Sequence, residues 1–161
     1  MRSIISVLVE NRAGILSRTA GLFARRGFNI ESLAVGETEN PSISRMTIVV
    51  EGDERIIEQV SKQLNKQIDV IKVRELKIGT ATQRELALAK VHATPKTRGE
   101  IMDIATIMKC KIVDLSPTTL TLEISDRPEK VKLVLNMLEP YGIAEMARTG
   151  MVALPKGSAP D

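Results

Sequence analysis

The chain has 161 residues, 43% of them hydrophobic, and carries 23 Lys and Arg against 20 Asp and Glu, a formal net charge of +3. This content is sufficient for one ordinary domain or two small ones and excludes a disordered tail. The three aromatic residues, Phe23, Phe28 and Tyr141, are too few for the base-stacking surfaces of most single-strand nucleic-acid modules, so we expect no nucleic-acid partner.

Cysteine usage and hydropathy indicate the compartment. The single cysteine, Cys110, cannot form an intramolecular disulfide, and no apolar run reaches transmembrane length. The first residues enter a strand-like pattern directly, without the layout of a signal peptide. We therefore expect a soluble cytoplasmic protein with no membrane partner.

The first half of the chain alternates strand and helix patterns. Residues 3–10 are apolar and β-branched, which predicts a strand, and they end at the turn-forming residues 11–14. Helical spacing over residues 15–26 ends at Gly27. Residues 28–36 predict a second strand, whose apolar phase slips by one residue, as a β-bulge would cause. A strand over 44–50, a helix capped by Asp53 and a strand over 68–76 complete the order βαββαβ.

The second half repeats this order after a short linker, residues 78–82. The expected features are a strand at 84–93, a capping box of Thr97 and Glu100 opening a helix, strands at 111–115 and 119–124, a helix from Asp126 to Pro140, and a strand within 143–154. We predict an α+β fold of two tandem ferredoxin-like domains, residues 1–77 and 83–161, the second with a short flexible tail.

Each predicted sheet has one face without helices. Strands such as residues 2–10 and 28–35 are too apolar on both faces to meet water. We expect that a second copy of the chain, or a partner subunit, covers them.

Residue types that support catalysis are sparse. His92 and Cys110 fall in different predicted elements, which favours a surface histidine and an inert thiol over a nucleophile and its base. Asp53 and Asp126 are expected to cap helices, and the remaining carboxylates are scattered, so we predict no catalytic residue and no metal ligands.

One strand-to-helix turn has the features of a binding site. The N–H groups of Gly14, Ile15 and Leu16 open a helix and suit a carboxylate such as that of an amino acid. The side chains of Asn11 and Asn29 can accept hydrogen bonds from the ammonium group, and apolar residues Ile30, Leu33 and Val35 can form a wall. The pattern also fits a tight turn with no ligand.

Two runs of sequence resemble a known family. The run NRAGILSRTAGLFARRGFNIESLAVG, with ENPSISRMTIVVEGD after it, resembles the N-terminal ACT domain of the small regulatory subunit of acetohydroxyacid synthase (acetolactate synthase). The run GIAEMARTGMVALPKG resembles the end of that subunit's second domain. Two positions differ from the family's pattern: residues 125–128 stand where a glycine-containing turn is common, and residues 156–157 read Lys-Gly where Arg-Gly is usual. These differences affect only the details expected of the second domain.

The resemblance implies a non-catalytic regulatory subunit in branched-chain amino acid biosynthesis. Its partner would be the catalytic large subunit, which holds thiamine diphosphate, Mg and FAD, while this chain holds no cofactor. The subunit would activate that enzyme and make it sensitive to feedback by valine or a related amino acid. The effector would lie between the ACT domains of a homodimer, with the loop residues of one chain, Asn11, Gly14, Ile15 and Leu16, facing Asn29 and Ile30 of its neighbour.

Three other interpretations remain open. The chain could be a free-standing ACT-type sensor that acts on another enzyme or on a transcription regulator. It could be an RNA-binding module on the same frame, against which the missing sheet aromatics argue. A small enzyme in its own right is the third, and the lack of a nucleophile and base pair makes it the weakest.

Overall fold

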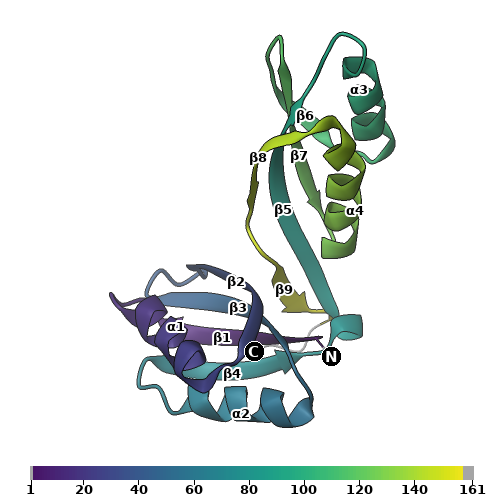
Figure 1. The fold of residues 1–161 in the computed structure, drawn as a ribbon. Coiled ribbons are helices and arrows are strands. Elements are labelled where there is room, and N and C mark those ends of the chain that lie inside the picture. The colour runs from purple at the N-terminus through teal and green to yellow at the C-terminus, as the bar shows by residue number, and fades with distance from the viewer. Residues whose placement is uncertain (1, 158–161) are drawn as a thin grey trace. The chain divides into compact units, whose positions relative to one another are not determined.

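The structure, a computed structural model, describes residues 2–157. The chain divides into two compact units: the first unit contains residues 2–82 and 151–157, and the second unit contains residues 83–150. The elements, labelled in Figure 1, are β1 (Arg2–Glu10), α1 (Ile15–Arg26), β2 (Asn29–Glu37), β3 (Ile43–Glu51), α2 (Glu54–Asn65), β4 (Val70–Leu76), a 3₁₀ turn η1 (Ile78–Thr80), β5 (Ala81–His92), α3 (Arg98–Ile107), β6 (Lys111–Leu115), β7 (Thr119–Asp126), α4 (Pro128–Leu138), a 3₁₀ turn η2 (Glu139–Tyr141), β8 (Ile143–Arg148) and β9 (Val152–Pro155).

The first unit is a four-stranded antiparallel sheet in the order β2-β3-β1-β4. Alternate β1 residues, Ile5, Val7 and Val9, point to one face and are fully buried there. Helices α1 and α2 pack on that face through Phe23 and Val60, among others, which forms one apolar core. The alternation of apolar residues along the strands therefore decides which face the helices cover.

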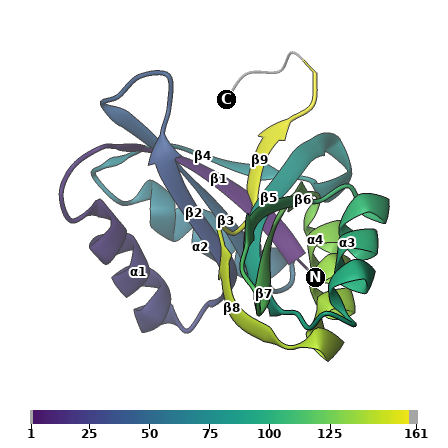
Figure 2. The same ribbon diagram turned by 90° about the horizontal axis from the view of Figure 1, so that it is seen from above.

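The second unit repeats this arrangement with the strand order β6-β7-β5-β8. Its core joins Ala87, Ala89 and Val91 of β5 to the inner faces of α3 and α4. Figure 2 shows both helices on the same side of β5 and β7. The predicted α+β fold of two tandem ferredoxin-like βαββαβ domains is confirmed.

Two local predictions in the first unit are also confirmed. The β2–β3 register shifts between Ile30 and Ser32, which is the expected bulge, and as a result both Ile30 and Leu33 pack against the helical core. Asp53 caps α2, since its Oδ1 accepts a hydrogen bond from the N–H of Ile56 at 3.0 Å.

Both caps predicted in the second unit are wrong. Thr97 already has helical angles (φ −94°, ψ −16°), so its hydroxyl reaches back and accepts from the N–H of Thr94 at 2.8 Å instead of capping α3 with Glu100. At α4, Pro128 occupies the first helical turn and makes Arg127 the N-cap. Asp126 instead accepts from the N–H of Arg127 at 2.8 Å.

The last part of the chain differs from the single strand predicted over residues 143–154. It forms two strands: β8 completes the second sheet, and β9 pairs with β5. Residues 151–157 belong to the first unit, whereas the sequence predicts them in the second domain. The predicted linker is shorter too, because Ala81 and Thr82 already belong to β5. The predicted flexible tail lies outside the described residues.

These returning residues, which we name the return segment (residues 151–157), cover part of the helix-free face of the first sheet. Met151 and Ala153 form a buried cluster with three sheet residues and with Ala81; the sheet residues are Ile4, Val49 and Leu76. All six are at most 5% exposed. The sequence predicts a second copy or a partner subunit as the cover, whereas the chain covers part of this face with its own residues.

Candidate functional site

The turn between β1 and α1 presents unpaired backbone N–H groups. Gly14 is the N-cap of α1 in the left-handed conformation (φ 86°), and no side chain caps the helix. Within residues 2–157, the N–H groups of Gly14 and Leu16 have no acceptor, whereas that of Ile15 makes a long bond of 3.4 Å to the carbonyl of Arg12. With the positive end of the helix dipole, these donors suit a carboxylate.

Asn11 anchors this turn to the β2–β3 hairpin. Its backbone N–H donates to the carbonyl of Ser42 at 2.8 Å. Its side-chain nitrogen donates to the carbonyl of Pro41 at 3.0 Å and to Oε1 of Glu37 at 3.4 Å. The side-chain oxygen accepts no hydrogen bond from the part of the chain described here, so it remains available as an acceptor for an ammonium group.

Arg18 is a charged residue at this turn that the sequence analysis missed. Its guanidinium forms an ion pair with the carboxylate of Asp69, a residue only 6% exposed. The same guanidinium lies 3.2 Å from the position that a Cβ on Gly14 would occupy. The i,i+4 spacing between Gly14 and Arg18 could have revealed this position in the sequence, because helical side chains lean back over the preceding turn. The turn therefore carries a guanidinium, paired with Asp69, in addition to its amides.

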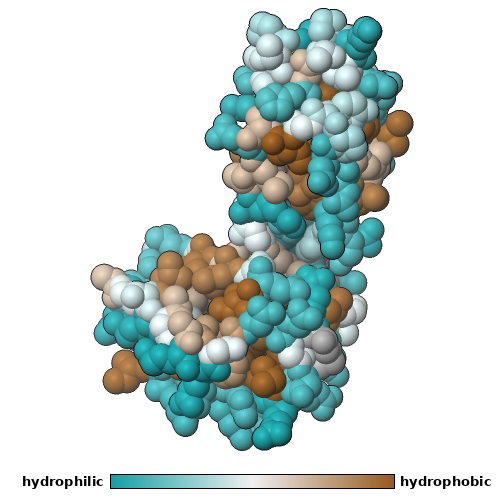
Figure 3. All heavy atoms as spheres, viewed as in Figure 1, coloured by the Kyte–Doolittle hydropathy of each residue, from teal (hydrophilic) through white to brown (hydrophobic). Residues whose placement is uncertain are grey.

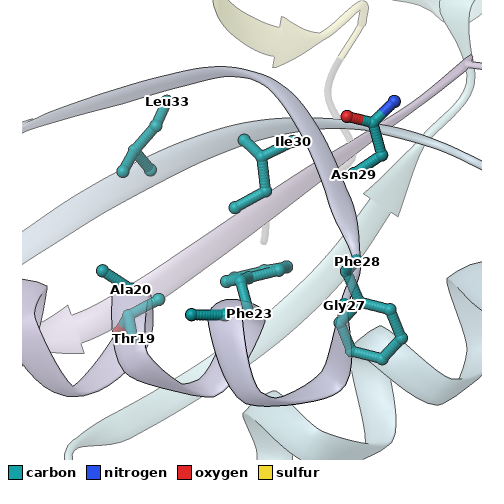
Figure 4. Close-up of a pocket in the computed structure, with 9 residues that line it drawn as sticks. Thr19, Ala20, Phe23, Gly27, Phe28, Asn29, Ile30 and Leu33 are labelled. Carbon is teal, nitrogen blue, oxygen red and sulfur yellow. The ribbon is translucent and has the colours of Figure 1, made fainter.

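Asn29 and Ile30 lie beyond the other end of α1, at the start of β2. They line an open groove of about 560 Å³ between α1 and β2, shown in Figure 4, together with Thr19, Ala20, Phe23, Ala24, Gly27, Phe28 and Leu33. The groove is mostly apolar, and Asn29 lines it where β2 begins. The rings of Phe23 and Phe28 meet edge to face there, with centroids 5.9 Å apart.

The six predicted effector residues therefore form two groups within one chain. Asn11, Gly14, Ile15 and Leu16 precede or open α1, and Asn29 and Ile30 follow it. The twelve residues of α1, a length of about 18 Å, lie between Gly14 and Asn29. A small amino acid cannot span that distance, so a single chain does not bring the two groups around one ligand.

Other reactive groups do not assemble into a site in the described residues. The pKa of Cys110 is raised because burial disfavours its thiolate. The pKa of Asp126 is lowered, first by the hydrogen bond from the N–H of Arg127 and then by Lys130 at 3.1 Å. Residues 2–157 contain no group of three metal-ligating side chains, and none of their helices has both the length and the apolar content needed to cross a membrane.

Comparison with known proteins assigns this architecture to a family. Residues 5–72 match the model of the AHAS small subunit-like ACT domain, and residues 84–157 match that of the small subunit of acetolactate synthase. The chain belongs to the acetolactate synthase small-subunit family. Residues 73–83 lie between the two matches and contain the end of β4, η1 and the start of β5, where the βαββαβ order starts again.

Individual members of the small-subunit family match over almost the whole chain. A protein of Archaeoglobus fulgidus named "Probable acetolactate synthase small subunit" is 51% identical over 98% of this chain and 99% of its own length. The acetolactate synthase small subunit of Mycolicibacterium smegmatis is 50% identical over 95% and 90%. The crystal structure of the Thermotoga maritima small subunit superposes with a TM-score of 0.92 at 38% identity, covering 99% of each chain.

The position of Arg18 can be tested with the two glycines that cap α1. Gly14 and Gly27 both have left-handed φ angles, 86° and 67°, so an alanine at either costs about 1–2 kcal/mol of stability. At Gly14 the new methyl group also meets Arg18, whereas nothing lies within 4 Å at Gly27. We expect Gly14→Ala to destabilise the first unit more than Gly27→Ala, measured by urea denaturation. The difference should vanish in an Arg18→Ala background, and equal losses in the native background would contradict the contact.

Proposed function

We propose that this chain is a non-catalytic regulatory subunit of acetolactate synthase that activates the catalytic subunit and confers feedback inhibition by valine or a related branched-chain amino acid. Family membership supports the enzyme partner. The observation that carries the feedback proposal is the separation of the polar groups to the two ends of α1. That separation calls for a ligand held between two chains.

In the proposed complex, each effector molecule touches both chains of a dimer. Its carboxylate binds the open N–H groups at Gly14 and Leu16 of one chain, near Arg18. Its ammonium is held by Asn11 of the same chain and by Asn29 of the other. Ile30 of that other chain supplies the apolar contact that favours a branched side chain over a polar one.

The surface along α1 and β2 suits the dimer contact. Strand β2 is an edge strand, so one side of its backbone has no partner in the first sheet. The adjoining face of α1 carries exposed small residues, Ala20, Ala24 and Gly27, which allow close approach of a second helix. Figure 3 shows apolar residues gathered over α1 and β2. Two copies pairing β2 to β2 would bury this groove and extend the sheet.

Regulation then follows from a difference in dimer geometry. The amino acid stabilises one arrangement of the two chains, and the catalytic subunit binds another more tightly. Such coupling is typically on the order of 1–3 kcal/mol, which changes an affinity several-fold to about a hundredfold. The thiamine diphosphate, Mg and FAD belong to the catalytic partner in this proposal, and this chain contributes no residue to the chemistry.

The dimer contact can be tested by charge insertion. Ala24→Arg places a long cation in the groove and is expected to convert the dimer to a monomer, because a symmetric contact meets the charge twice. Gln59→Arg, on the exposed side of α2, adds the same charge away from the groove and is the matched control. Light scattering after gel filtration gives the mass. A dimer in both variants would contradict the contact.

The effector site can be tested by separating feedback from activation. Gly14→Asp introduces a negative charge beside the open amides, so it repels the effector carboxylate and draws Arg18 toward itself. We expect valine inhibition to be lost while activation of the catalytic subunit is retained. Gly79→Asp, at an open position of η1, is the control and should inhibit normally. Calorimetry that finds unchanged valine binding to Gly14→Asp would contradict the site.

A further inference from the structure

The return segment follows the second unit in the chain and contacts β2. The chain leaves the first unit in β5, forms all of the second unit, and re-enters the first unit at Met151. Met151 follows β8 by only two residues, Thr149 and Gly150. The hydroxyl of Thr149 accepts from the N–H of Leu86 at 3.1 Å, which fixes the end of β8 to β5. Two residues therefore separate the return segment from the last strand of the second unit.

On the first unit, the return segment is held by packing and by hydrogen bonds. The side chains of Met151 and Ala153 are each 4% exposed and contact the apolar cluster on the helix-free face. The N–H of Lys156 donates to the carbonyl of Thr80 at 2.8 Å. The N–H of Met151 donates to the hydroxyl of Ser32 at 3.0 Å, in a partly buried position. Of these contacts, the Ser32 hydrogen bond is the one made to β2.

The β-bulge determines where Ser32 points. Between Ile30 and Ser32 the register shifts by one residue, so Ile30 and Leu33 face the helical core and Ser32 faces the other side of the sheet. The strand residues in the groove and the serine that holds the return segment thus lie on opposite faces of one short stretch, with only Glu31 between Ile30 and Ser32. A change in backbone angles at the bulge moves both faces together, because the extra residue sets the strand's twist.

We propose that Ser32 is a positioning residue that transmits effector occupancy from β2 to the return segment and so to the second unit. An amino acid that contacts Asn29 and Ile30 fixes the bulge, the bulge orients the Ser32 hydroxyl, and the hydroxyl holds Met151 at the point where the chain leaves the second unit. This inference rests on the proposed function, since it describes how the same site is read out. It requires no contact between the two units beyond the continuous chain.

The primary test uses hydrogen exchange in the full chain, with valine as the probe. Ser32→Ala removes the acceptor for the N–H of Met151, and Ser32→Thr keeps a hydroxyl there. Ser42→Ala is the control, because it removes a hydroxyl hydrogen bond to Asn40 in the same hairpin but does not touch the return segment. We expect valine to slow exchange of residues 151–156 in the native chain, in Ser42→Ala and in Ser32→Thr, and to leave it unchanged in Ser32→Ala.

A second measurement separates binding from response. Ser32→Ala should bind valine with an affinity within about threefold of the native chain. In the complex with the catalytic subunit, saturating valine lowers activity, and this decrease should be about fivefold smaller in Ser32→Ala, the effect of one hydrogen bond. Full inhibition in Ser32→Ala, or valine-dependent exchange of residues 151–156 without the hydroxyl, would overturn the inference. Absence of valine binding to the native chain would instead overturn the proposed function on which the inference rests.

Discussion

The length of helix α1 is the constraint on which the functional account depends. Open amides at its start and the Asn29 amide beyond its end are each suited to one charged group of an amino acid, yet about 18 Å of helix keeps them apart in one chain. A second chain that pairs along β2 can bring its own Asn29 to the first chain's Gly14. In the proposed dimer, ligand binding and association are therefore linked, and the ligand favours the associated state.

The first sheet shows how the two faces of one strand can serve different purposes. On the helical face, alternating residues form the core that fixes α1 and therefore the open amides. On the other face, the return segment covers Ile4, Val49 and Leu76, so the chain itself buries this part of its apolar surface. A hydrogen bond from the N–H of Met151 to the hydroxyl of Ser32 also holds that cover to β2. Under the proposed readout, Ser32 and Met151 would serve both stability and signal transmission.

Sequence patterns predicted the elements well because the apolar spacing is regular. Spacing and residue type alone predict the helix over residues 15–26, the β2 bulge and the Asp53 cap. The capping errors arose where the backbone angles of the residue itself, Thr97, or a neighbouring proline decided the geometry. The return of residues 151–157 could not be predicted, since a short apolar strand fits either sheet and only tertiary packing selects one.

The central claim, that each effector site takes its halves from two chains, can be tested by complementation. Gly14→Asp disables the loop half and Asn29→Ala the strand half, so neither variant alone should bind valine well. When the two are mixed and exchange subunits, each mixed dimer has one site with both halves native, and about a quarter of all sites should recover native affinity in calorimetry. If each site instead lay within one chain, every site in the mixture would carry one defect, and no recovery would be seen.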